Sequence, residues 1–138
     1  MDRLLIVDDD EDYCRIIKKA FKKRFFELQV LEAYDGDTAF NVFVEFRPDV
    51  IILDVMLPIG NGWETCRRIR AWEDRQYTAN GGAAKSHRTK RTLILMVTAI
   101  GPNLNEMTSP LYGADAYIDK PIRASEIIAE VEKLLETR

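Results

Sequence analysis

The sequence predicts a doubly wound α/β fold, a three-layer sandwich in which helices cover both faces of a central parallel sheet of five strands. Short β-favouring runs alternate with helical patterns along the chain, as they do in serial βα units joined by right-handed crossovers. In addition, the run Val50-Ile51-Ile52-Leu53 is apolar without interruption, which is typical of a strand buried on both faces. A length of 138 residues suits a single domain over residues 1–138.

The first half of the chain contains two predicted strands and two predicted helices. We expect the strands over residues 4–7 and 28–34, and the helices over residues 10–24 and 38–46. Apolar residues at helical spacing define the inner face of the first helix as Tyr13, Ile16, Ile17, Ala20 and Phe21. The inner face of the second helix is expected to consist of Ala39, Phe40 and Phe43. Asp35-Gly36-Asp37 supplies the turn and cap residues before this helix.

The second half begins with the apolar strand and contains two more, over residues 50–53, 92–97 and 115–118. A helix is predicted over residues 63–77, with Cys66, Ile69 and either Ala71 or Trp72 facing inward. Gly101-Pro102 opens a further helix, which Pro110 ends. Ser125 is the expected N-cap of the last helix, whose apolar stripe consists of Ile127, Ile128, Val131, Leu134 and Leu135.

Residues 78–91 interrupt the alternation of strands and helices. The stretch begins with small, polar and Gly-rich sequence and continues with the basic residues Lys85, Arg88, Lys90 and Arg91, together with His87. This composition predicts a flexible loop inserted between the third helix and the fourth strand. The basic part of the loop is either solvated or a contact for a partner protein or a nucleic acid.

Composition and charge exclude several classes of protein. A hydrophobic share of 46% and a charged share of 31% fit a folded globular chain and not a disordered one. The net charge of -3 argues against direct nucleic-acid binding. Two cysteines, Cys14 and Cys66, and one histidine are too few for a zinc site or a disulfide framework; we expect both thiols to be buried in helices.

The chain has no predicted membrane segment. No apolar run approaches the roughly 18 residues of a membrane-spanning helix, and the acidic N-terminus leads directly into a strand, unlike a signal peptide. We therefore expect a cytoplasmic location.

Chemically active side chains follow four of the predicted strands. Asp8 and Asp9 come after the first strand, Asp54 after the third, Thr98 after the fourth and Lys120 after the fifth. Sites in open α/β sheets form at the carboxyl ends of the strands, so these side chains are expected to lie together. Each could also have a plainer role: Asp8 and Asp9 could cap the first helix, Thr98 could be an ordinary strand residue and Lys120 could be solvated.

Three neighbouring carboxylates raise one another's pKa unless a cation relieves their repulsion. Mg²⁺, or Mn²⁺, is the expected cation because hard divalent ions prefer oxygen ligands. A carboxylate, a metal ion, a lysine and a hydroxyl are also the groups that phosphoryl transfer needs. The set therefore predicts phosphoryl chemistry at this edge of the sheet.

Four motifs, each after the appropriate strand, resemble those of response regulator receiver domains of two-component signalling. They are Leu5-Ile6-Val7-Asp8-Asp9, Ile52-Leu53-Asp54-Val55-Met56-Leu57-Pro58 with Gly62, Val97-Thr98-Ala99, and the segment from Gly113 to Lys120-Pro121. The resemblance covers nearly the whole chain. It implies the flavodoxin-like strand order 2-1-3-4-5, a Mg²⁺-dependent phosphoacceptor that is not an independent enzyme, and a histidine kinase or histidine phosphotransfer protein as partner.

The resemblance also implies roles for individual residues. Asp54 matches the phosphoacceptor, Asp8 and Asp9 match the metal-binding pair, and the backbone carbonyl of Met56 completes the metal site. Lys120 matches the lysine that pairs with the phosphoryl oxygens, followed by Pro121, whose preceding peptide bond is often cis. Thr98 and Tyr117 match the switch pair, although Tyr117 could equally be a packing aromatic.

Two further features concern the lifetime of the phosphoryl group and a departure from the spacing of the family motifs. Met56 and Ile100, each two residues after a site residue, are apolar and cannot orient an attacking water, which predicts slow loss of the phosphoryl group. Thr98 stands 44 positions after Asp54, a longer interval than is usual in the family, and the excess coincides with residues 78–91.

Two other functions stay open. A haloacid-dehalogenase-like phosphatase also pairs a strand-end aspartate with a second acid two residues later, as Asp8 and Asp10 are placed, but Glu11 and Asp12 follow where that family has Thr or Val. A phosphate-independent interaction module of receiver-like fold is the second alternative. The chain is either a stand-alone receiver or part of a longer protein, and phosphorylation could make it a homodimer.

Overall fold

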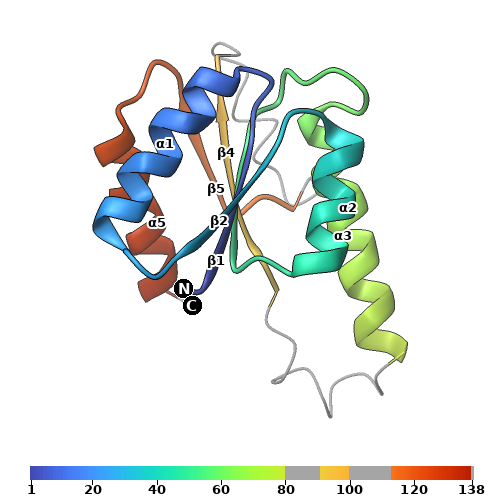
Figure 1. Ribbon diagram of the computed structural model, residues 1–138. Coiled ribbons are helices and arrows are strands. Elements are labelled where there is room, and N and C mark those ends of the chain that lie inside the picture. Colours follow the sequence, from blue (N-terminus) through green and yellow to red (C-terminus); the bar gives the residue numbers. More distant parts are fainter. Residues whose placement is uncertain (80–90, 100–112, 138) are drawn as a thin grey trace.

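The computed structural model describes residues 1–79, 91–99 and 113–137, and its ribbon is drawn in Figure 1. Five strands form one parallel sheet: β1 (Arg3–Val7), β2 (Gln29–Ala33), β3 (Val50–Leu53), β4 (Leu93–Thr98) and β5 (Ala116–Asp119). Their order is β2-β1-β3-β4-β5. The predicted fold class and strand order are therefore confirmed.

The described helices form two layers on opposite faces of the sheet (Figure 1). They are α1 (Glu11–Arg24), α2 (Gly36–Phe46), α3 (Gly62–Ala79) and α5 (Ala124–Glu136). α1 and α5 cover one face, and α2 and α3 cover the other. The helix predicted after Gly101 lies outside the described residues, as does the inserted loop over residues 80–90.

Each face of the sheet has its own hydrophobic core because side chains alternate along a strand. In β1, Leu4 and Ile6 pack in the core on the α1 and α5 side, whereas Leu5 and Val7 pack in the core on the α2 and α3 side. All four residues of β3 are buried, as the apolar run predicted. None of the described helices combines the length and the apolar character needed to cross a membrane.

The inner face of α1 differs from the prediction at one position. Cys14, Ile17 and Phe21 are buried, and their spacing of three and four residues centres the apolar stripe on their side of the helix. Ile16 lies on the opposite side and is 64% exposed, so its assignment to the inner face was wrong. Asp10 begins the helix as its N-cap, accepting hydrogen bonds from the backbone N–H groups of Asp12 and Tyr13.

Two further predictions needed correction at helix ends. α3 extends to Ala79, two residues into the predicted loop, and its inner face uses the half-buried Trp72 and not the exposed Ala71. The N-cap of α5 is Arg123 and not Ser125. The Glu126 side chain accepts a hydrogen bond of 3.4 Å from the Arg123 backbone N–H, which places the helix start two residues earlier than a serine cap would.

Candidate functional site

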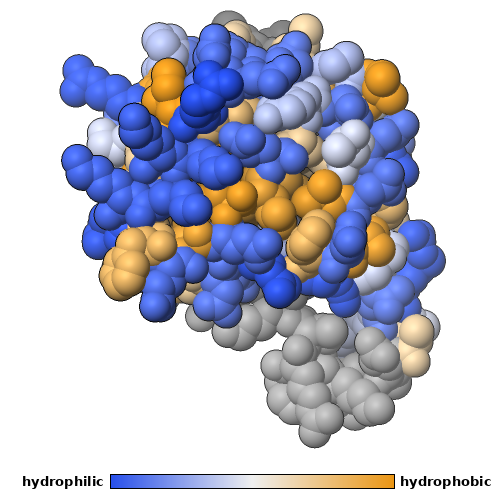
Figure 2. Space-filling view, in the orientation of Figure 1, coloured by the Kyte–Doolittle hydropathy of each residue, from blue (hydrophilic) through white to orange (hydrophobic). Residues whose placement is uncertain are grey.

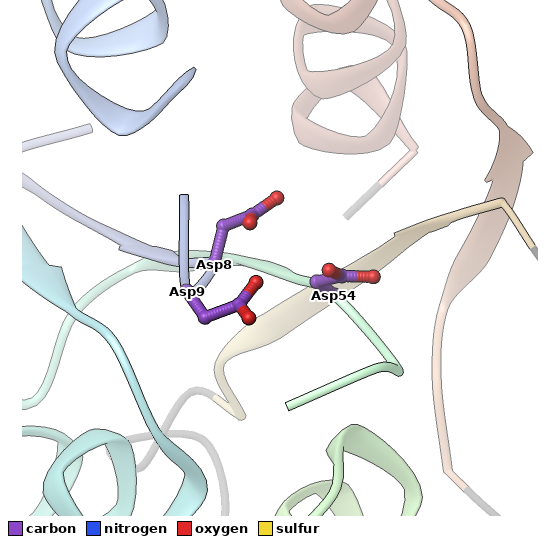
Figure 3. A group of neighbouring side chains, drawn as sticks. All are labelled: Asp8, Asp9 and Asp54. Atoms are coloured by element: carbon purple, nitrogen blue, oxygen red, sulfur yellow. The ribbon is translucent and has the colours of Figure 1, made fainter. Parts of the chain in front are cut away.

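Asp8 and Asp54 lie side by side because they follow neighbouring parallel strands. Val7 of β1 and Leu53 of β3 are in register, so the next residue of each strand reaches the same edge of the sheet. Asp9 follows Asp8 directly, and Figure 3 shows the three side chains as neighbours at the ends of these strands. One oxygen from each of Asp8, Asp9 and Asp54 lies within 4.8 Å of the others. The clustering predicted from the strand ends is therefore present for these three carboxylates.

Backbone contacts hold the carboxylates in place. The Asp8 carboxylate accepts a hydrogen bond of 2.9 Å from the Asp10 backbone N–H. The Asp54 carboxylate accepts a longer one, of 3.3 Å, from the backbone N–H of Met56. Gly62 passes so close to this turn that a Cβ atom there would lie 2.2 Å from the Asp54 carbonyl oxygen, which explains the glycine at that position.

Lys120 reaches the same cluster from the end of β5. Its Nζ lies 2.7 Å from Oδ2 of Asp8 and 3.6 Å from Oδ2 of Asp54. The Nζ also lies 4.5 Å from the centroid of the Tyr13 ring, within the range of a cation–π contact. The Lys120–Pro121 peptide bond is cis, as the resemblance implied.

Burial and charge act against each other in this cluster. Asp54 is only 6% exposed, and burial raises its pKa; Lys120 lowers this pKa and the Asp8 carboxylate raises it again, so that the net shift is upward. Burial lowers the pKa of Lys120, but the hydrogen bond to Asp8 and the charges of Asp54 and Asp8 outweigh this effect and raise it. Lys120 therefore stays protonated and compensates part of the negative charge.

The residues fit a hard divalent cation. Three carboxylates face one ammonium group, which leaves a net negative charge in a partly buried site. Each carboxylate offers an oxygen atom, the ligand that hard divalent cations prefer. Asp8, Asp9 and Asp54 would each supply a carboxylate oxygen. The Met56 side chain is 64% exposed and points no polar atom at the site; its backbone carbonyl as a further ligand stays a prediction.

The expected switch residues are described only in part. Thr98 ends β4, where its backbone is in register with Asp119, but its side chain and the whole of Ile100 lie outside the described part of the chain. Tyr117 lies in β5, half-buried, and its ring stacks on Trp63 of α3 with 6.0 Å between centroids and 16° between planes. This aromatic packing is compatible with both roles considered for Tyr117.

Sequence reasoning did not assign Tyr13 to the site. It counted Tyr13 among the inner residues of α1, whereas the half-buried ring sits against the Lys120 ammonium group. Its position one helical turn after Asp9 was the available signal, because the first turn of α1 lies beside the carboxyl ends of β1 and β3.

Comparisons with known proteins agree with this geometry. The family model for the response regulator receiver domain matches residues 4–132. Among solved structures, the receiver domain of the Francisella response regulator 1452 is 23% identical, with 99% of this chain and 98% of that chain covered and a TM-score of 0.77. The chemotaxis protein CheY4 of Vibrio cholerae is 22% identical, with coverage of 96% and 98% and a TM-score of 0.75.

A third similar structure is the BeF3-activated N-terminal receiver domain of Klebsiella pneumoniae RstA. It is 24% identical, with coverage of 95% of this chain and 96% of that chain and a TM-score of 0.73. At this level of identity the solved structures establish the shared fold, and the family assignment comes from the family model, which spans all the site residues.

Proposed function

Because this chain belongs to the response regulator receiver domain family of two-component systems, we propose that Asp54 accepts a phosphoryl group from a phosphohistidine of a sensor kinase or histidine phosphotransfer protein. The observation that carries the proposal is the cluster at the sheet edge. Asp8, Asp9 and Asp54 converge within 4.8 Å, and Lys120 bridges Asp8 and Asp54.

The proposed reaction is an in-line displacement at phosphorus. A carboxylate oxygen of Asp54 forms the new P–O bond while the P–N bond of the phosphohistidine breaks, and the electron pair of that bond returns to the imidazole nitrogen. Lys120, already 3.6 Å from Asp54, stabilises the negative charge on the transferred oxygens. Asp8 holds the Lys120 ammonium group in place through its 2.7 Å hydrogen bond.

Asp8, Asp9 and Asp54, with the Met56 carbonyl, would hold Mg²⁺ or Mn²⁺. When bound, the metal supplies positive charge to the phosphoryl oxygens. Asp9 is the exposed member of the set, whereas Asp8 and Asp54 are buried, so Asp9 is the side chain best placed to meet an arriving ion.

We propose that Thr98 and Tyr117 transmit the phosphorylated state. Thr98 would bond the acyl phosphate, and the Tyr117 ring would change its packing against Trp63. The phosphorylated state would then favour a homodimer, and sedimentation velocity before and after phosphorylation measures this.

We further propose that the acyl phosphate is lost over minutes to hours. Met56 and Ile100 offer no side-chain group that could orient an attacking water. Timing the loss of label from the phosphorylated protein in Mg²⁺ tests this, and decay within seconds would contradict it.

The central experiment is phosphorylation by acetyl phosphate, followed by intact-protein mass spectrometry. We expect a gain of one phosphoryl mass that requires Mg²⁺ and is lost in Asp54→Asn. Asp12→Asn is the matched control, since Asp12 is an exposed carboxylate on α1, and it should be phosphorylated like the native protein. If no Mg²⁺-dependent mass gain occurs, the chain is a phosphate-independent interaction module instead.

We propose that the chain is not an independent enzyme and promotes only its own phosphorylation and dephosphorylation. The competing phosphatase function makes a different prediction. Steady turnover of a generic phosphate ester, many times per protein molecule, would favour the haloacid-dehalogenase-like alternative, whereas a receiver should give no sustained turnover.

A further inference from the structure

A groove separates α1 from the outer strand β2, and none of the clustered carboxylates lines it. It has a volume of about 450 Å³. Its α1 side carries four cationic side chains, those of Arg15, Lys18, Lys19 and Lys22, and its β2 side carries Glu32 and Tyr34. The concentration of cations contrasts with the net charge of -3 of the whole chain.

β2 also presents an open backbone edge beside this groove. Among residues 1–79, 91–99 and 113–137, β2 is the last strand of the sheet on this side. The backbone N–H of Gln29 donates to Asp2, and the carbonyl of Ala33 accepts from Asp8, so odd-numbered residues of β2 face β1. Along a parallel strand the N–H and C=O groups of alternate residues point to opposite sides, so those of Val30 and Glu32 point outward, where a further strand could pair.

The surface over this edge is suited to a polypeptide. Figure 2 views the molecule from the β2 side and shows apolar surface gathered across the middle, over the region of β2 in Figure 1, with hydrophilic side chains of α1 beside it. Tyr34, at the groove, is 37% exposed, and its hydroxyl donates a 3.0 Å hydrogen bond to Glu32. The groove therefore offers backbone pairing, apolar contact and positive charge together.

We propose that this groove binds an extended acidic segment of a partner protein, which adds as a strand to the outer edge of β2. Alternate acidic side chains of the segment would reach the cations of α1. Arg15 is already paired with Asp12 at 2.7 Å. The remaining cations, Lys18, Lys19 and Lys22, still exceed the two carboxylates in the groove, Glu11 and Glu32, and so favour an anionic partner. The site shares no residue with Asp8, Asp9, Asp54 and Lys120 and is independent of the proposed phosphoacceptor function.

Two other occupants fit less well. Antiparallel pairing of β2 with β2 of a second copy would bring the two basic α1 helices to the same face of the joined sheet, where like charges repel. Single-stranded nucleic acid would use the cations but not the outward backbone groups of Val30 and Glu32, and would meet the carboxylates of Glu11 and Glu32.

The test uses a fluorescent peptide of alternating glutamate and valine as the probe. We expect saturable binding that weakens with added salt, and slower hydrogen exchange at the Val30 and Glu32 amides in the complex. A peptide of alternating glutamate and proline carries the same charge but lacks the N–H groups of the valines, and it should bind about tenfold more weakly.

Charge reversal on α1 provides the matched variants. Lys18→Glu/Lys22→Glu should weaken binding of the glutamate-valine peptide about tenfold or more. Lys23→Glu makes one such charge reversal on the same helix, outside the groove residues, and should leave binding within about twofold. Far-UV circular dichroism and the midpoint of thermal unfolding should be unchanged in all these variants, which verifies their folding.

Four results would overturn the proposal. The first is no saturable binding of the peptide, and the second is a loss of peptide affinity in Lys23→Glu equal to that in Lys18→Glu/Lys22→Glu. The third is tighter binding of oligo(dT) than of the peptide. The fourth is protection of the Val30 and Glu32 amides from exchange without peptide, accompanied by self-association in sedimentation experiments. None of these outcomes depends on whether Asp54 is phosphorylated.

Discussion

At the scale of single residues, Ile59 has an unfavourable backbone conformation. Its φ of 47° lies in the left-handed region, which is rare for a β-branched residue. The conformation directs the Ile59 carbonyl to the start of α2, where it accepts hydrogen bonds from the backbone N–H groups of Gly36 and Asp37. The side chain gains little in return, since it is 67% exposed.

Ile59→Asn should therefore stabilise the protein. Asparagine tolerates the left-handed region better than isoleucine does, and we expect the free energy of unfolding to rise by about 1 kcal/mol. Urea denaturation measures the change. Ile16→Asn is the control, because Ile16 is similarly exposed but lies in the regular helix α1, where asparagine should cost a few tenths of a kcal/mol. Equal effects at the two positions would contradict the argument.

Cys66 provides a prediction about pH. Burial raises the pKa of its thiol to about 11, against a smaller lowering by Arg70. The folded chain therefore holds this proton more tightly than the unfolded chain does, so the contribution of Cys66 to stability is complete below about pH 9 and is lost as the pH rises toward 11. Iodoacetamide reacts with the thiolate form of cysteine. At roughly pH 8 it should therefore label Cys66 only after the protein unfolds.

Peptide mapping by mass spectrometry checks this prediction. Labelling of Cys66 should accelerate with urea in step with global unfolding, and Cys14, whose pKa burial raises to about 12, should behave alike. Fast labelling of Cys66 in the native protein would show that its thiol is neither buried nor raised in pKa.

At the scale of secondary-structure elements, Arg70 joins α3 to the beginnings of β4 and β5. Its guanidinium donates to the carbonyl oxygens of Gly113 and Thr92 at 2.7 and 2.8 Å. It also pairs with Glu73 at 2.7 Å and with Asp115 at 2.8 Å. The Asp115 carboxylate in turn accepts a hydrogen bond from the Ile94 backbone N–H, so one buried cation connects three elements.

Arg70→Met should destabilise the fold by roughly 2–3 kcal/mol, because it leaves the half-buried Glu73 carboxylate and the carbonyl groups of Gly113 and Thr92 without this donor. Arg70→Lys should restore only part of the lost stability, since an ammonium group cannot reproduce the planar set of N–H donors of a guanidinium group. Urea denaturation measures both. Arg67→Met is the control: Arg67 is 60% exposed, and its loss should change stability by less than about 0.5 kcal/mol. A similar cost at both positions would refute the role assigned to Arg70.

The carboxylate cluster with Lys120 could be predicted from the sequence, whereas the contacts of Arg70 could not. Asp8, Asp54 and Lys120 were found because strand ends can be recognised locally and a parallel sheet brings them to one edge. Arg70 was not singled out, because all its partners except Glu73 are 22 to 45 positions away in sequence and no local pattern marks a buried arginine. Helix periodicity identified α1 but placed Ile16 on the wrong face. Ile16 and Ile17 are adjacent, and the pattern alone does not specify which of the two faces the sheet.

At the scale of the whole molecule, the metal site exists only when the fold does. Asp8 and Asp9 follow β1, and Asp54 follows β3, 45 positions after Asp9. The sheet brings the three carboxylates within 4.8 Å, where their mutual repulsion opposes folding. A cation bound to all three would therefore bind the folded chain and not the unfolded one.

Mg²⁺ should stabilise the protein by the free energy of this linkage, about 1.4 kcal/mol at roughly ten times its Kd. Thermal unfolding at increasing MgCl2, against NaCl of equal ionic strength, measures the effect. Asp9→Asn and Asp54→Asn should each remove most of the response, whereas Asp12→Asn, which changes an exposed carboxylate outside the cluster, should retain it. If the native chain and Asp54→Asn respond equally to Mg²⁺, the ion acts through general screening, and the three carboxylates do not form its binding site.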